Sequence, residues 1–173
     1  VQAFMKLVNQ TDAESDFMMT EPGERKINAF QLTLSISTGA QVIFIAEEDD
    51  ELLGQLVAFP MYGQGSRTKH VVHVGLSALR SHWGKGIGNA LFNTMEAWAL
   101  ESGIFRLELS VMTHNERGIA LYKKQGYEIE GTKKASIFVS SQFPRYQHQN
   151  GRILESFILV VLKQIQRETR YFD

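Results

Sequence analysis

Residues 83–89 place three glycines and a lysine between an apolar run and an amphipathic helix. Glycine has no Cβ, so Gly84, Gly86 and Gly88 can adopt positive φ and allow a ligand close to the backbone. The helix that follows would point unpaired N–H groups and the positive end of its dipole at the same place, which favours an anion such as pyrophosphate. Lys85 adds a mobile positive charge. The segment therefore predicts a phosphate-binding turn.

The glycine spacing distinguishes this turn from two common nucleotide-binding loops. The loop of nucleotide hydrolases is longer and continues from its lysine to a Ser or Thr that holds magnesium, whereas Lys85 is followed by Gly86 and Ile87. The dinucleotide fingerprint requires a different spacing, Gly-x-Gly-x-x-Gly. The residues thus disfavour both nucleotide sites, and a merely flexible turn stays open as the alternative to a phosphate site.

The turn resembles the acetyl-CoA loop of the GNAT family of N-acetyltransferases, whose signature is Gln/Arg-x-x-Gly-x-Gly/Ala between a strand and a helix. Gly86 and Gly88 match the two small positions, and Trp83 stands where the family has Gln or Arg. The resemblance implies that backbone groups near the end of the strand bind the pantetheine arm and that the turn cradles the pyrophosphate. The implied coenzyme-binding residues are Leu76, Ser77, Ala78, Trp83, Gly84, Lys85, Gly86, Ile87, Gly88 and Asn89.

A second segment, residues 113–127, is similar to the family pattern Asn-x-x-Ala-x-x-Leu-Tyr-x-Lys-x-Gly-Phe. Gly118 occupies a position that is usually Ala, and Tyr127 replaces Phe. Asn115 can cap the helix expected over 116–125 by accepting a backbone N–H. The resemblance also implies that Asn115 contacts the coenzyme and that Tyr122 lies near its sulfur. Two ordered motifs about thirty residues apart make a chance match improbable.

Acyl transfer to an amine needs a base for the ammonium proton and a donor for the departing thiolate. Tyr122 is the expected donor, because a phenol with an ordinary pKa near 10 stays protonated at pH 7. It could instead only pack its helix onto the sheet. The base is left open between Glu108, His73 and Glu24, which lies on a loop that the family uses near the acceptor.

Composition narrows the functional classes. The chain has 173 residues, no cysteine and a net charge of −1. There is thus no cysteine nucleophile, no disulfide and no thiolate zinc site, and we expect direct transfer without a metal. The balanced charge gives no overall attraction to nucleic acid or to an anionic membrane. We find no signal peptide or membrane-length apolar run, so we expect a cytoplasmic protein.

Apolar spacing and turn residues predict the order of elements. Helices are expected over 1–9 (or as far as Thr11 and Asp12), 27–38, 87–102 and 116–125. Strands are expected over 41–46, 52–59, 69–76, 106–111, 135–139 and 156–162. The third strand leads into the phosphate-binding turn, as ligand turns do in open α/β sheets.

The expected fold is a mixed, mostly antiparallel α/β sheet with helices on both faces, the GNAT fold. Adjacent strands in that family splay apart, and the pantetheine arm occupies the gap. We expect one domain over residues 1–173. The family's first strand would be missing, and residues 132–173 depart from the family's short hairpin.

The expected function is transfer of an acetyl group from acetyl-CoA to a primary amine of a small molecule or a protein N-terminus. The alternative is a non-catalytic module of the same fold that binds acyl-CoA and regulates. The sequence does not identify the acceptor or the oligomeric state, and a homodimer is among the states left open.

Overall fold

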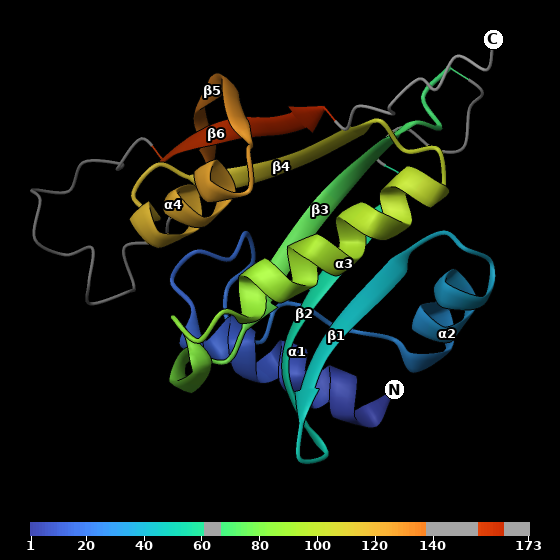
Figure 1. Cartoon of the computed structure of the whole chain (residues 1–173). Helices are drawn as coiled ribbons and strands as arrows, with labels where there is room; N and C mark the ends of the chain where they lie inside the picture. The colour runs from blue at the N-terminus through green and yellow to red at the C-terminus, as the bar shows by residue number, and fades with distance from the viewer. Residues whose placement is uncertain (61–66, 138–155, 165–173) are drawn as a thin grey trace, which may run out of the picture.

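In the described part of the chain, a six-stranded sheet forms the centre, in the order β1-β2-β3-β4-β6-β5 (Figure 1). The computed structural model describes residues 1–60, 67–137 and 156–164. The strands are β1 (Val42–Glu48), β2 (Glu51–Phe59), β3 (Val71–Ala78), β4 (Arg106–Met112), β5 (Glu128–Ile137) and β6 (Ser156–Gln164). The helices are α1 (Gln2–Glu14), α2 (Ala29–Ser37), α3 (Ile87–Glu101) and α4 (Glu116–Lys124), with a short 3₁₀ helix, η1 (Arg80–His82).

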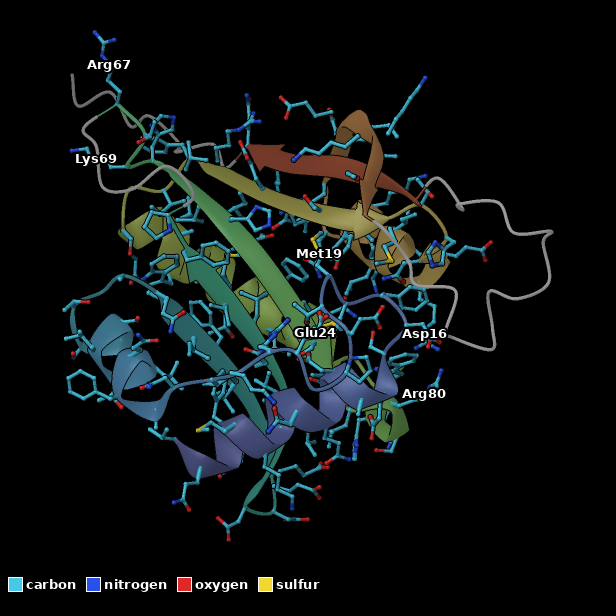
Figure 2. The ribbon with its side chains drawn as sticks, turned by 180° about the vertical axis from the view of Figure 1, so that it is seen from behind. Asp16, Met19, Glu24, Arg67, Lys69 and Arg80 are labelled. Atoms are coloured by element: carbon cyan, nitrogen blue, oxygen red, sulfur yellow. The ribbon has the colours of Figure 1, made fainter. Side chains whose placement is uncertain are left out.

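Helices cover both faces of this sheet. Figure 1 shows α3 and α4 in front of the sheet, and the view from the opposite side in Figure 2 brings α1 and α2 to the front. All neighbouring strands run antiparallel except β3 and β4, which are parallel. The predicted fold class is therefore confirmed.

The alternation of side chains along the strands separates two environments. Val72 and Val74 of β3 and Leu107 of β4 pack into the main core with Phe92 and Met95 of α3. The residues between them on each strand point to the opposite face, which α1 and α2 cover. His73 of β3 and Glu108 of β4 lie on this second face.

Helix α1 runs to Glu14, beyond the predicted end near Asn9 or Asp12. Its last turns carry polar residues that look like a helix end in the sequence but have partners elsewhere in the fold. The hydroxyl of Thr11 donates to the carbonyl of Val8 at 3.0 Å, and its oxygen lies 3.1 Å from Ser77 Oγ, which can donate to it. The carboxylate of Glu14 accepts from the backbone N–H of Arg80 at 2.7 Å.

Strand β5 begins at Glu128, well before the predicted start at Ala135. It is the last strand in the sheet order, and its charged residues Glu130, Lys133 and Lys134 are exposed. An edge strand with polar side chains lacks the apolar pattern on which the prediction relied. The expected strand over 156–162 is confirmed as β6, whereas residues 138 and 139 lie outside the described residues.

Candidate active site

The two parallel strands at the centre of the sheet separate along their length. Val71–His73 pair with Arg106–Glu108, and no pairing joins β3 to β4 in the described residues beyond that register. β3 nevertheless continues to Ala78 and β4 to Met112. In the described residues, the edge of β3 that faces β4 therefore has no partner strand over residues 74–77, so its backbone N–H and C=O groups are available to a ligand.

This gap opens into a cavity of about 1010 Å³. The cavity extends from the glycine turn, past the gap, to the face of the sheet under α1 and α2. Its lining includes these predicted site residues: His73, Leu76, Ser77, Ala78, Trp83, Gly84, Gly86, Ile87, Gly88, Asn89, Asn115 and Tyr122. Among the predicted residues, Lys85, Glu108 and Glu24 do not line it.

The glycine turn presents an uncapped helix N-terminus to the cavity. Gly84 and Gly86 have φ of +80° and +90°, which side chains rarely adopt. Gly86 is the N-cap of α3, where no side chain caps the helix and no acidic residue lies in the first turn. The first N–H groups of α3 are thus available to an anion.

Gly88 has a different role from the one predicted. It lies inside α3, and a Cβ there would approach Leu121 Cδ2 of α4 to 2.7 Å. The missing side chain allows α3 and α4 to pack closely, and positive φ is not required. The prediction that all three glycines shape the turn by conformational freedom was wrong for Gly88.

Trp83 fixes the turn to the end of β3. Its indole N–H donates to the carbonyl of Ala78 at 2.8 Å, so this carbonyl already has a partner. The guanidinium carbons of Arg80 and Arg117 lie 5.3 Å and 4.9 Å from the centre of its ring, within the range of cation–π attraction. Trp83 thus holds two cations beside the turn.

Arg117 is a site residue that the sequence patterns did not predict. It lines the cavity from the first turn of α4, and a Cβ on Gly84 would lie 4.0 Å from its terminal nitrogen. A positively charged residue in the first turn of a helix is unfavourable because it lies at the positive end of the helix dipole. This unfavourable position is the feature of the sequence from which a functional role for Arg117 could have been predicted. Lys85, the predicted cation, is exposed and outside the cavity lining.

Helix α4 presents Asn115 and Tyr122 to the cavity. Asn115 Oδ1 accepts from the backbone N–H of Gly118 at 2.9 Å, which confirms the predicted cap. A Cβ on Gly118 would approach Asn115 Nδ2 to 2.8 Å, so the glycine leaves room for this cap. Asn89, a predicted coenzyme contact, accepts from Gln125 Nε2 at 2.9 Å and joins α3 to α4.

The phenol of Tyr122 lies against two aromatic rings, those of Phe92 at 5.8 Å and Tyr127 at 6.1 Å. Burial raises the pKa of Tyr122 to about 12. The phenol therefore stays protonated at neutral pH and can donate a proton or a hydrogen bond.

His73 lines the cavity on the α1/α2 face. Burial lowers the pKa of His73 from its ordinary value of 6.5, although the charge of Glu108 opposes this shift. The imidazole is therefore neutral at pH 7, as a proton acceptor must be. Its Nδ1 is buried without a hydrogen-bond partner in the described part of the chain.

The two carboxylates predicted as alternative bases have other partners. Glu108 is buried and forms an ion pair with Arg106, which also bridges to Glu130 at 2.6 Å. Glu24 Oε2 accepts from the backbone N–H of Glu21 at 2.9 Å and closes a turn. The cavity lining thus favours His73 over both carboxylates.

Comparison with known proteins agrees with this geometry. The family model described as "Acetyltransferase (GNAT) family" matches residues 9–127. The chain belongs to the GNAT family. The predicted resemblance is therefore confirmed, and the gap between β3 and β4 lies where the family was expected to hold the pantetheine arm.

GNAT relatives are found among both sequences and structures. The L-amino acid N-acetyltransferase of Escherichia coli is 30% identical over 105 residues, covering 58% of this chain and 56% of that protein. The L-2,4-diaminobutyric acid acetyltransferase of Marinococcus halophilus is 30% identical over 111 residues, covering 64% and 63%. The matches thus span less than two thirds of either relative's length.

The solved structure of an acetyltransferase from Salmonella typhimurium with its cofactor acetyl-CoA is 14% identical to this chain in sequence and superposes on it with a TM-score of 0.77. The alignment covers 96% of this chain and 88% of that one. At this identity the likeness supports the fold alone. No helix in the described ranges is long and apolar enough to cross a membrane.

Proposed function

We propose that this protein transfers the acetyl group of acetyl-CoA directly to a primary amine. The observation that carries the proposal is the gap between β3 and β4, which opens into one cavity with the glycine turn, Tyr122 and His73. The GNAT family membership and relatives named as acetyltransferases support it.

The extended pantetheine arm would lie in the gap and bond to the free backbone groups at 74–77 of β3. The pyrophosphate would lie on the first N–H groups of α3, with Arg117 supplying positive charge. We propose acetyl-CoA as the coenzyme because the chain belongs to the GNAT family and a structure of the same fold was solved with acetyl-CoA.

The chemistry then requires proton transfers at the nitrogen and at the sulfur. His73, neutral at pH 7, takes a proton from the ammonium of the acceptor, and the free amine attacks the thioester carbonyl carbon. The C–S bond breaks as the N-acetyl product forms. Tyr122 donates a proton to the departing thiolate, and the nitrogen loses its second proton as the amide forms, which restores the phenol directly or through water. His73 releases its proton to solvent, and the products are CoA and the acetylated amine.

The non-catalytic acyl-CoA-binding module would keep the glycine turn without depending on Tyr122. We expect Tyr122→Phe to lower kcat about 100-fold, at the lower end of the usual contribution of an acid–base group, with acetyl-CoA affinity nearly unchanged. The phenyl ring keeps the packing against Phe92 and Tyr127. Turnover is measured as the rate of CoA release in the presence of an amine, detected with a thiol reagent. Calorimetry measures the affinity for acetyl-CoA.

Tyr127→Phe is the matched control. Its hydroxyl is buried without a hydrogen-bond partner in the described residues, and Tyr127 does not line the cavity. Turnover of this variant should match that of the wild type. Equal turnover of Tyr122→Phe and the wild type would remove Tyr122 from the mechanism, and acetyl-CoA binding without transfer to any amine would favour the module.

A further inference from the structure

The charge of the cavity lining differs from that of the whole chain. The chain has 19 acidic and 18 basic residues, yet no Asp or Glu is among the described residues that line the cavity. Four cations line it instead: Arg25, Lys26, Arg117 and Lys124. A cavity of this charge attracts anions and repels cations.

These cations lie in two groups on opposite faces of the sheet. Arg117 and Lys124 belong to α4, on the side of the glycine turn, where the phosphates of the coenzyme would account for them. Arg25 and Lys26 belong to the loop between α1 and α2. Figure 2 shows this loop, marked by Met19 and Glu24, in front of the sheet on the face that carries His73.

The Arg25 side chain is positioned by a buried carboxylate. Its Nε lies 3.2 Å from Asp12 Oδ2, and the Asp12 side chain is only 3% exposed. Asp12 follows Thr11, whose hydroxyl is bonded to Ser77 of β3, so the pair is fixed against the sheet. The terminal nitrogens of Arg25 have no further ion pair or hydrogen bond in the described part of the chain, and they can donate to a ligand in a fixed geometry.

Apolar and polar side chains share the rest of this part of the cavity, and the polar ones include Asn28, Gln31 and Gln55. Phe17, Met18, Met19, Ile27 and Phe59 line it beside Arg25 and His73. A ligand on this face can therefore contact aromatic and methionine side chains, and no carboxylate is among the described lining residues.

From these observations we infer that the acceptor is a small amine that also bears a carboxylate, held by the terminal nitrogens of Arg25, with an apolar side chain against the methionines and aromatic rings. An α-amino acid with an apolar side chain has this chemistry. The inference rests on the proposed function, because it names the acceptor of that reaction. A polyamine or a lysine-rich peptide would meet Lys26 and Arg25, and the carboxylate that pairs with Arg25, that of Asp12, is buried and does not line the cavity.

The test compares acceptors that differ only in the carboxylate. We would measure kcat/KM for L-leucine, L-methionine and L-phenylalanine, for their three amides, and for spermidine. In the wild type we expect the acids to be used and spermidine not. In Arg25→Gln the ratio of acid to amide should fall about 10- to 100-fold, as expected for loss of a hydrogen bond to a charged group. The amino groups of an acid and of its amide differ in intrinsic reactivity. This difference is the same for every variant, so it does not affect the comparison of the acid-to-amide ratio between variants.

If Arg25→Gln folds poorly, the inference can still be tested with two further variants. The double variant Asp12→Asn/Arg25→Gln removes both charges, leaves no unpaired buried carboxylate, and should show the same fall in ratio while binding acetyl-CoA. Lys6→Gln is the matched charge control, because Lys6 is exposed on α1 and does not line the cavity, and its ratio should equal that of the wild type.

The outcomes separate the two proposals. Wild-type transfer to amides or spermidine as readily as to acids, or an unchanged ratio in both Arg25 variants, would overturn the acceptor inference and leave the acetyltransferase intact. Failure to transfer acetyl groups to any of these amines or to a wider amine panel would overturn both.

Discussion

His73 is the residue that we propose as the proton acceptor for an incoming amine. Burial lowers the pKa of His73, whereas Glu108 is already paired with Arg106. We expect His73→Gln to reduce kcat/KM about 10²- to 10⁴-fold, the usual contribution of a general base. The measurement is initial-rate kinetics from pH 5 to pH 9.

The pH dependence of kcat/KM tests whether His73 acts as the base. Wild-type kcat/KM should fall as the pH drops through the folded pKa of His73, which burial holds below its ordinary value of 6.5, and His73→Gln should lose this acid limb. The folded pKa is below the unfolded one, so stability should also fall as the pH drops from 6.5 through the folded value. An acid limb that survives in the variant would assign the base to another group.

Some individual residues can be assigned from the sequence and others cannot. Asn115 is predictable as a cap because capping depends on neighbours within one turn. The roles of Arg117 and Arg25 are not, because they depend on Trp83 and Asp12, which approach them only in the fold. Lys85 is the predicted cation for its place beside the glycines, yet its side chain lies outside the cavity lining.

At the scale of helices and strands, close packing of β2 against the start of α3 holds the glycine turn in place. Gly54 of β2 lies against the start of α3, where a Cβ would meet Ile87 Cγ2 at 3.0 Å and the backbone oxygen of Ser77 at 3.1 Å. Gly54→Val should lower the free energy of unfolding by about 1–3 kcal/mol, because the backbone neighbour cannot move aside cheaply. Urea denaturation measures this change.

Gly131→Val is the control for this substitution. Gly131 lies in β5 with no atom of the described residues within 4 Å of a built Cβ, and its φ is not positive. We expect a change within about 0.5 kcal/mol, as for most surface substitutions. Equal stability of the two variants would show that the contact at Gly54 does not constrain β2 against α3.

The limits of prediction at this scale follow from edge strands and tertiary partners. β1, β2 and α3 carry strong apolar patterns, and their predicted bounds are close to the observed ones. β5 has polar residues at the edge of the sheet, and the last turns of α1 gain partners in β3, the α1–α2 loop and η1. Neither feature leaves a periodic signal in the sequence.

At the scale of the whole molecule, the family motifs predict the right fold. The apolar pattern runs along all of β3 and does not reveal that only Val71–His73 pair with β4. The split is expected from the resemblance alone. The net charge of the sequence likewise does not predict the charge of the cavity. The chain as a whole is nearly neutral, yet no acidic residue is among the described residues that line the cavity.

We propose above all that the split sheet and the glycine turn bind acetyl-CoA. The most direct test is calorimetric titration of the purified protein with acetyl-CoA, beside free CoA and ATP with magnesium. We predict saturable binding of acetyl-CoA and no binding of ATP. Absence of binding by both acetyl-CoA and CoA to the folded protein would contradict the claim and leave the turn a structural feature.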